Sequence, residues 1–542
     1  MKRRDFLATT TLAGVVSVLS ESCNTAQTNT NTAAAAPTPF ADHFELNEVS
    51  ISELQQKIKG NQYNAQELVK TYLERIDQID KKGPAINSII EVNPDAMDIA
   101  RKLDEELKAG KSRGPLHGVP VVIKDNIDTA DKMKTSAGSL ALANSVAPKD
   151  SFVAQKLREA GAIIIAKTNL SEWANIRSSH STSGWSGRGG LTKNPYALDR
   201  NACGSSSGTG AAIAANLAIA GIGTETDGSI VCPSTHNSLV GIKPTVGLIS
   251  RSGIIPISHS QDTAGPMTRN VTDAAILLGA LTGIDPRDTA TNASQGKSYT
   301  DYTKFLDAKG LNGMRIGVAR NFFGINERTD KLITDAIDVM KKNGAVIIDP
   351  ADIAHTNEYD ESEILLYELK ADLNAYLATL GPGAAVKTLK DIIDFNEQNR
   401  DTELKHFGQD LFMKAQEKGP LTDKAYLDAL AKNQRLSRAE GIDAIMDKEK
   451  LDAMIAPSGG TAWLTDLING DHFSGGYSSP SAVAGYPHIT VPAGYIHGLP
   501  IGLSIFGRAW SEPVLIKIAY AYEQATQHRR RPEFLATANL NA

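Results

Sequence analysis

The sequence predicts an α/β protein, an α/β/α sandwich in which helices cover both faces of a large mixed central sheet. Segments with helical apolar spacing alternate with short β-branched runs along most of the chain. The 542 residues, 41% of them apolar and 22% charged, are enough to bury a large core. No linker-like segment interrupts this pattern between residues 45 and 535. One domain over 45–535 is therefore predicted.

The elements follow from local patterns, in chain order. Amphipathic spacing predicts helices over 51–59, 65–79, 94–110, 151–161 and 329–344, and a last helix from Pro513 to about His528. Apolar and β-branched runs predict strands over 119–123, 162–169, 314–319, 345–349, 451–458, 487–494 and 499–507. The helical region from about Glu361 to Lys450 is read as an insertion that covers a site.

Two Gly/Ser segments stand out from this alternation. CGSSSGTG, residues 203–210, precedes the apolar run Ala211 to Ala220, which predicts a buried helix whose N-terminus is the serine loop. GTETDGSIVCP, residues 223–233, follows that helix. A helix that leaves one loop and a chain that returns beside it would bring Ser205 and Ser229 together. The alternative interpretation of the first segment is a flexible connector.

The charge balance and the N-terminus bear on location. A net charge of −6 gives no reason to expect nucleic acid as a partner, and the body of the chain has no apolar segment long enough to span a membrane. Residues 1–24 have a basic start, an apolar stretch and small polar residues, which predicts a twin-arginine-like export signal, with a lipid anchor at Cys23 as a further hypothesis. Residues 25–44 read as a low-complexity linker. We therefore expect a periplasmic or envelope-associated protein; the alternative is a cytosolic protein with a chance basic tail.

The cysteines and histidines indicate no metal or cofactor. Cys203 and Cys232 flank the two serine loops, and they could pair if the loops converge, but we expect two buried free thiols. No CxxC, HExxH or clustered Cys/His spacing is present. A phosphate loop is also excluded, because no lysine follows the glycines.

Two arrangements would make a serine reactive. Residues 204–208 match G-x-S-x-G, which suggests an esterase of the α/β-hydrolase type with Ser206 as nucleophile, but no strand leads into this turn. The other arrangement uses a neutral lysine as base, which requires burial to lower its pKa. Lys124 ends the apolar strand and suits that role; a lysine that extends to water from the strand end is the alternative interpretation.

Five blocks together resemble the amidase signature family over about residues 45–530: HGVPVVIKDNID, CGSSSGTGAA, GTETDGSIVCP, VGIKPTVGLISRSGIIPISHSQDTAGPM and GLPIGLSIFG. The resemblance implies that Ser229 is the nucleophile, Lys124 the base, and Ser205 the residue that relays the proton. It also implies an unusual cis peptide bond before Ser205.

The resemblance further implies an oxyanion hole from the backbone N–H groups of Thr226, Asp227 and Gly228, with that of Ser229 as an additional donor. The commonest family pattern is G-T-D-T-G-G-S-I-R, so Glu225, Asp227 and Val231 depart from it. A carboxylate beside a developing oxyanion is repulsive. The Asp227 side chain must therefore point away from the oxyanion or be neutralised.

These departures, with NLSEWAN, SGWSGRGG and SQDTAGPM, resemble the bacterial peptide amidases more than the tRNA-dependent amidotransferase subunits. The resemblance implies hydrolysis of the C-terminal amide of peptides. Trp173, Asn175 and Trp185 are candidate substrate contacts, with Arg177 as a further polar contact, although such aromatics also occur in cores. Amidases of other aliphatic or aryl amides, and an exported binding protein that has lost catalysis, are the alternatives.

Overall fold

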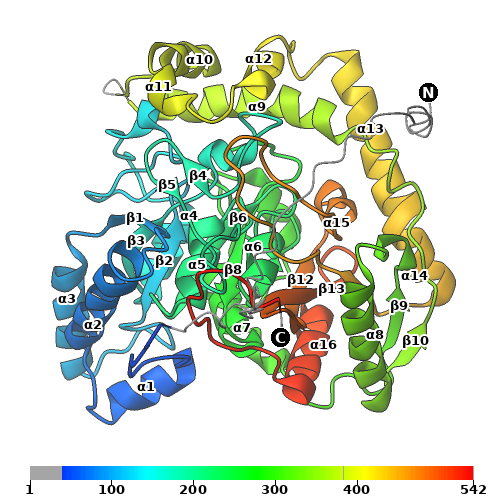
Figure 1. Cartoon of the computed structure of the whole chain (residues 1–542), viewed down its shortest axis with the longest axis horizontal. Coiled ribbons are helices and arrows are strands. Elements are labelled where there is room, and N and C mark those ends of the chain that lie inside the picture. The colour runs from blue at the N-terminus through cyan, green and yellow to red at the C-terminus, as the bar shows by residue number, and fades with distance from the viewer. Residues whose placement is uncertain (1–39, 382–383, 541–542) are drawn as a thin grey trace, which may run out of the picture. The chain divides into compact units, whose positions relative to one another are not determined.

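The computed structural model describes residues 40–381 and 384–540, and this part of the chain forms one compact unit (Figure 1). The predicted export signal, Cys23 and most of the predicted linker lie outside the described residues. At the centre is an eleven-stranded sheet. In spatial order its strands are β1 (Ile89–Val92), β3 (Ile163–Thr168), β2 (Pro120–Lys124), β6 (Ala220–Glu225), β8 (Thr263–Thr268), β7 (Val240–Lys243), β12 (His488–Ile496), β13 (Leu499–Phe506), β11 (Ala453–Pro457), β9 (Arg315–Val318) and β10 (Val346–Ile348).

The sheet is mixed, as predicted. Strands β3, β2 and β6 are parallel neighbours, and so are β11, β9 and β10. The strands between β6 and β11, and the edge pair β1 and β3, are antiparallel. Strands β2, β3 and β6 are buried along their whole length, which is why they read as apolar runs rather than alternating ones. A small hairpin, β4 (Trp185–Ser186) with β5 (Gly190–Leu191), stands apart from the sheet.

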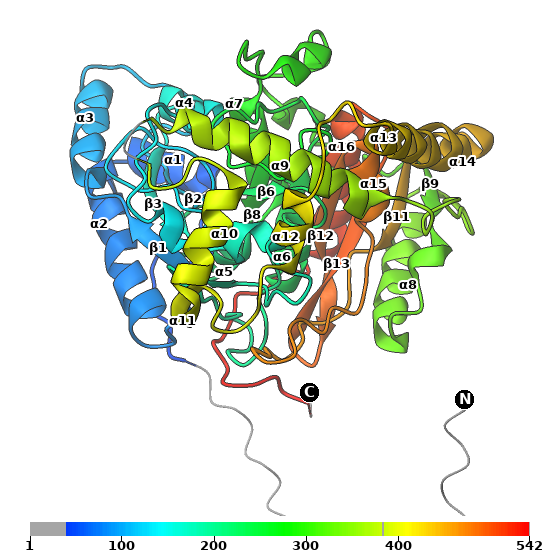
Figure 2. The same cartoon turned by 90° about the horizontal axis from the view of Figure 1, so that it is seen from above.

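Helices pack against the sheet in two groups (Figure 2). Helices α5 and α6 touch each other; α5 packs on β2, β3, β6 and β8, and α6 on β7, β12 and β13. In the second group, α7 packs on β6, β7 and β8, α8 on β10 to β13, and α16 on β12 and β13 and on both α7 and α8. The bounds are α1 (Ile51–Lys59), α2 (Ala65–Arg75), α3 (Ala96–Lys108), α4 (Phe152–Glu159), α5 (Ser207–Ala214), α6 (Val231–His236), α7 (Val271–Leu281), α8 (Glu327–Lys342), α15 (Ser479–Ala484) and α16 (Glu512–Thr526). None of the helices in the described chain has both the length and the apolar character needed to cross a bilayer.

The region from residue 361 to 449 is helical, as predicted. It comprises α9 (Glu361–Thr379), α10 (Leu389–Gln398), α11 (Arg400–Glu403), α12 (Asp410–Gln416), α13 (Lys424–Ser437) and α14 (Asp443–Glu449). Helices α9, α10 and α12 enclose an apolar cluster of their own, which also takes in Leu142 and Trp173 from the body of the domain. Polar contacts anchor this cover, because the Tyr376 hydroxyl donates to Asp128 at 2.9 Å. Figure 1 shows α9 running along one side of the molecule above the central strands.

Two local predictions were wrong. The helix predicted over Ala211 to Ala220 ends at Ala214, because Asn216 takes a left-handed φ of 58° and the chain then enters strand β6. Pairing of β6 with β2 and β8 overrides the helix propensity of the alanines. The folded unit also begins earlier than predicted, since Asp42, placed in the linker, forms a buried ion pair with Arg75 at 2.9 Å.

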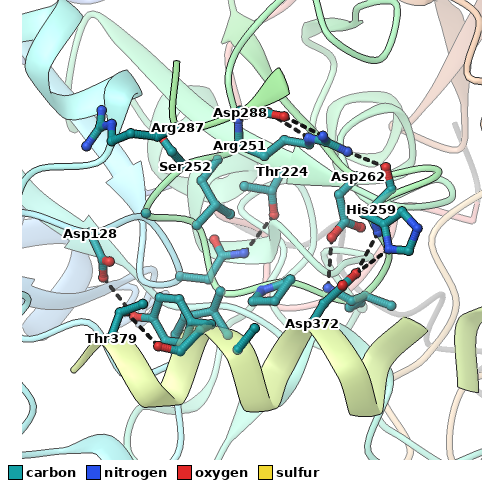
Figure 3. Close-up of a pocket in the computed structure, with 18 of the residues that line it drawn as sticks. Asp128, Thr224, Arg251, Ser252, His259, Asp262, Arg287, Asp288, Asp372 and Thr379 are labelled. Carbon is teal, nitrogen blue, oxygen red and sulfur yellow. Dashed lines mark hydrogen bonds and ion pairs between the residues drawn. The ribbon is translucent and has the colours of Figure 1, made fainter. Parts of the chain in front are cut away.

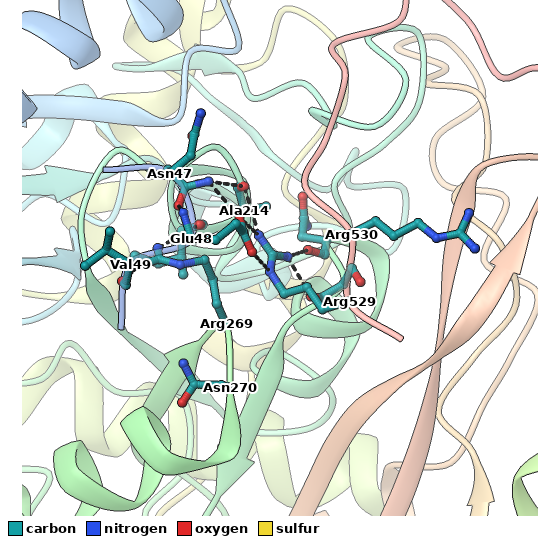
Figure 4. Close-up of polar contacts among 12 residues, drawn as sticks. Asn47, Glu48, Val49, Ala214, Arg269, Asn270, Arg529 and Arg530 are labelled. Carbon is teal, nitrogen blue, oxygen red and sulfur yellow. Dashed lines mark hydrogen bonds and ion pairs between the residues drawn. The ribbon is translucent and has the colours of Figure 1, made fainter. Parts of the chain in front are cut away.

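The two ends of the described chain meet over α5 (Figure 4). Arg529 pairs with Glu48 at 2.8 Å and donates to the carbonyl of Ala214 at 3.2 Å. Burial opposes the charge on Glu48, but the guanidinium of Arg529 lowers the pKa of this carboxyl to about 2. Arg269 donates to the carbonyl of Val49 at 2.7 Å. These charge-assisted bonds hold the helix that follows the first serine loop.

Cys203 and Cys232 form a disulfide with a Cα–Cα distance of 5.9 Å, so the expectation of two free thiols was wrong. The chain brings the two serine loops close enough for pairing, which spacing in the sequence does not reveal. Closing a loop between cysteines 29 positions apart stabilises a fold by about 3–4 kcal/mol in the chain-entropy model. The bridge is buried beside Trp463.

Candidate active site

Lys124 occupies the last position of β2 and is completely buried. Its Nζ donates to the hydroxyl of Ser205 at 2.8 Å, and to the hydroxyl and carbonyl of Thr224 at 3.0 and 3.3 Å. Burial lowers the pKa of this amine to about 7, although the carboxylates of Asp262 and Glu225 oppose the shift. At neutral pH a large fraction of Lys124 is therefore uncharged and able to accept a proton.

The loop that carries Ser205 is tightly packed. The peptide bond between Gly204 and Ser205 is cis, as the resemblance implied. A side chain at Gly204 would place its Cβ 2.2 Å from the hydroxyl of Ser171, so only glycine fits. The carbonyl of Ser205 accepts from the backbone N–H of Ser171 at 3.0 Å. The Gly/Ser segment is thus a fixed loop rather than a flexible connector.

Two bonds join this loop to the one that carries Ser229. The backbone N–H of Ser206 donates to the carbonyl of Ser229 at 3.2 Å, and the disulfide links Cys203 to Cys232. The Ser229 residue keeps 8% of its surface exposed, whereas Lys124 and Ser205 have none. The two loops therefore bring the backbone of Ser229 next to that of Ser206, the residue after Ser205.

The turn over residues 226–229 presents free backbone donors. Among the described residues, no protein acceptor is within hydrogen-bond distance of the N–H groups of Thr226, Asp227, Gly228 or Ser229. Glu225 shapes the turn, because its carboxylate accepts from the N–H groups of Ile230 and Val231 at 2.7 and 3.0 Å. Unbonded N–H groups on consecutive residues are suited to a developing oxyanion.

The departure at Asp227 is accommodated by its neighbours. Its Oδ2 accepts a hydrogen bond from the hydroxyl of Ser479 on α15 at 2.6 Å. The side chain thus lies against α15.

The hydroxyl of Ser206 is bonded to the protein backbone. It donates to the carbonyl of Thr224 at 3.1 Å and accepts from the backbone N–H of the same residue at 3.2 Å. The segment before it, residues 192–203, contains turns and isolated bridges but no strand. A nucleophile elbow at Ser206 is therefore not formed.

A cavity of about 570 Å³ adjoins the site from the side of Thr224 and Thr226 (Figure 3). Its walls combine an apolar run, residues 254–257, with charged side chains and with α9. The charged side chains include Arg251, Asp262, His259 and Asp372. Burial raises the pKa of Asp262 to about 6, partly offset by hydrogen bonds such as that from the Thr226 hydroxyl. Ser229 is not among the wall residues, although Thr224, Glu225 and Thr226 of the same segment are.

The predicted substrate contacts lie around this cavity rather than on its walls. Trp173 packs edge-on against Phe412 and borders a small recess that shares Ala174 with the cavity. Asn175 donates to the hydroxyl of Ser183 at 3.1 Å. Trp185 packs against Phe407. Among the described residues, neither Asn175 nor Trp185 lines the cavity.

Arg177, the further polar contact that we predicted, is buried and paired with Glu172 at 2.6 Å. Sequence reasoning did not assign roles to Thr224 and Asn126. Both lie at strand ends next to quoted motif residues, and Asn126 donates to the Thr224 hydroxyl at 3.0 Å. Their position next to Lys124 depends on the adjacency of β2 and β6.

Two groups of side chains in the described chain have the spacing of metal ligands. In the first, Cys203 and Cys232 with His236, the two sulfurs are bonded to each other. In the second, His259 is hydrogen-bonded to Asp372 at 2.9 Å, and Glu368 accepts from the hydroxyls of Ser258 and Ser260. The donors of both groups are thus engaged within the protein.

The sequence model of the family described as Amidase matches residues 67–516 of this chain. This chain belongs to the amidase signature family. The structure of the native peptide amidase from Stenotrophomonas maltophilia superposes with a TM-score of 0.86 at 47% identity, covering 91% of this chain and 99% of that one. The probable amidase of Arabidopsis thaliana is 40% identical over 514 residues, which cover 93% of this chain and 95% of the relative.

This amidase is less similar to the glutamyl-tRNA(Gln) amidotransferases. The matching amidotransferase subunit of Thermoanaerobacter pseudethanolicus is 34% identical over 515 residues, which cover 91% of this chain and all of the relative. The predicted family, the predicted α/β fold and the predicted amidase class are therefore confirmed. This amidase is a hydrolase that cleaves amide carbon–nitrogen bonds.

Proposed function

We propose that this amidase hydrolyses the C-terminal carboxamide of peptides to a carboxylate and ammonia, through an acyl-enzyme on Ser229. The observation that carries the proposal is the 47% identity to a peptide amidase over nearly the whole of both chains. The cavity supports it, because an apolar wall beside charged groups suits a ligand with both side chains and a polar backbone.

In the proposed mechanism, neutral Lys124 takes a proton from the Ser205 hydroxyl, to which it is already hydrogen-bonded. Ser205 takes the proton of Ser229 as the Ser229 oxygen attacks the amide carbon. The resulting oxyanion accepts hydrogen bonds from the N–H groups of the turn over 226–229, and a donor of this kind contributes about 3–4 kcal/mol to catalysis.

Collapse of the tetrahedral intermediate breaks the C–N bond, and the proton held by Lys124 passes to the departing nitrogen through the same relay. Ammonia leaves, and the acyl group stays on Ser229. A water molecule then gives its proton to the relay and attacks the ester, which releases the carboxylate and regenerates the serine.

Substrate choice is tested by measuring ammonia release from matched amides. Amidated dipeptides should have a kcat/KM at least about tenfold above those of free amino acid amides, fatty amides and aryl amides, because additional peptide contacts add binding energy in the transition state. The corresponding peptide methyl esters test whether the acyl part alone directs binding. Preference for a fatty or aryl amide would overturn the peptide assignment and leave the amidase class intact.

We also propose that residues 1–24 direct export of a folded passenger, that the low-complexity stretch after Cys23 tethers the catalytic domain, and that Cys23 carries lipid. The sequence layout of the N-terminus supports export, and so does the disulfide, because such bonds persist in oxidising compartments.

Changing Arg3 and Arg4 together to lysine should abolish recovery of activity from the envelope fraction, while Lys2→Arg should not. Palmitate labelling of the wild type should be lost in Cys23→Ser. Full export of the double lysine variant would refute the twin-arginine assignment, and an unlabelled wild type would refute lipidation.

A further inference from the structure

Asp227 places a carboxylate on the turn that is assigned to the oxyanion. One of its oxygens, Oδ2, accepts from Ser479, but the other, Oδ1, is buried and has no donor among the described residues. A buried carboxylate oxygen without a partner is costly, and a full negative charge at this turn would oppose a second one. The arrangement therefore calls for a further proton donor next to Asp227.

Glu361, the first residue of α9, lies in that position. Its carboxyl group interacts electrostatically with that of Asp227. It is also tied to the turn by Gln261, whose Nε2 donates to Glu361 Oε1 at 2.7 Å and approaches the carbonyl of Thr226 at 3.4 Å. The helical cover and the catalytic turn thus meet at two carboxyl groups.

No cation neutralises this pair, since neither Asp227 nor Glu361 forms an ion pair among the described residues. Lys243 interacts electrostatically with both Asp227 and Glu225, but its Nζ is bonded to the carbonyl of Tyr486 at 2.7 Å and forms no ion pair with either carboxyl among the described residues. The other titratable groups around the pair are acids and phenols, namely Glu225, Asp262, Tyr359 and Tyr477. A proton shared between the two carboxyls would remove one of the two charges, which the field of Lys243 alone does not do.

We propose that protonated Glu361 is a positioning residue for the oxyanion turn, which donates its proton to Asp227, holds that side chain away from the oxyanion and keeps the Glu361–Asp227 pair singly charged. Loss of the proton would leave two adjacent carboxylates beside the developing oxyanion and slow the reaction. This role rests on the proposed function, because it takes the turn over 226–229 as the oxyanion site.

Glu361 is expected to lose its proton within the pH range in which activity can be measured. Burial and the neighbouring Asp227 raise the pKa of Glu361 to about 8. Protonation is required for activity, so kcat/KM should fall about tenfold per pH unit above that value. Together with the requirement for neutral Lys124 above a pKa of about 7, the profile should be bell-shaped with a narrow optimum.

The test uses Glu361→Gln in the full-length enzyme. Glutamine can donate to Asp227 through its amide at every pH, so kcat/KM at pH 7.5 should stay within about threefold of wild type, and the decline above pH 8 should disappear. At pH 9 the ratio of variant to wild-type activity should reach about ten. Glu363→Gln, on the same helix and paired with Lys418 at the surface, is the matched control and should keep the wild-type profile.

Asp227→Asn is a second variant, which removes the neighbouring charge and should likewise lose the alkaline decline. The proposal is overturned if Glu361→Gln retains the wild-type decline, or if it lowers activity by one factor at all pH values, as a structural role would. Labelling of Ser229 by a fluorophosphonate is scored separately in the same variants. An unlabelled Ser229 in the wild type would refute the proposed function, whereas a labelled Ser229 with an unchanged pH profile would refute only the role of Glu361.

Discussion

Ser229→Ala should lose at least about 10⁴-fold in kcat on an amide substrate, because it removes the proposed nucleophile, which lies at the end of the turn with the unbonded N–H groups. The fold should be retained, since removing one hydroxyl from a partly exposed position leaves no cavity of consequence. A fluorophosphonate should label the wild type at Ser229 and leave the variant unlabelled.

Ser206→Ala is the matched control. Its hydroxyl bonds only to the backbone of Thr224, so the variant should stay active and reactive toward the probe, with a modest loss of stability. If Ser206→Ala were inactive and Ser229→Ala active, the nucleophile would be Ser206 and the esterase alternative would replace the proposed mechanism. Ser205→Ala should keep a small residual activity, because it removes the relay but neither the nucleophile nor the turn.

Replacing Lys124 should have an effect of similar size. Lys124→Met keeps most of the volume and removes the base, so kcat should fall about 10⁴-fold or more. Lys124→Arg should be equally inactive, because a guanidinium stays protonated at any accessible pH. Activity above about a tenth of wild type in Lys124→Met would show that another group is the base.

The pH dependence of the wild type reports the same lysine. Burial lowers the pKa of Lys124 to about 7, so the neutral form, which is the base, increases as pH rises through 7. Values of kcat/KM should therefore fall about tenfold per pH unit below 7 and level off above it, before the decline assigned to Glu361. An acid limb with a midpoint near 10, the ordinary lysine range, would contradict a buried neutral base.

The sequence predicted helices and strands best where the pattern that defines them lies within a few consecutive residues. The helices over 51–59 and 329–344 have amphipathic spacing and capping residues within one or two turns, and the structure places helices there. The strand before Lys124 was predictable because a short β-branched run that follows glycine and proline strongly favours a strand over a helix or a loop. The helix predicted over 211–220 was wrong because the chain turns over 215–219 and enters strand β6 at Ala220, which pairs with Val121, 99 positions earlier in the chain.

The family, the α/β architecture and the identity of the candidate residues Lys124, Ser205 and Ser229 were determined by the sequence, because motif blocks and periodicities are properties of contiguous residues. The tertiary structure alone decided that Thr224 holds the lysine, that Cys203 bonds to Cys232, and that Gln261 joins Glu361 to the turn at Thr226. Each of these contacts depends on which strands are neighbours in the sheet and on where the helices of residues 361–449 pack. The burial of these side chains, their partners and their pKa values follow from that packing and not from any local sequence pattern.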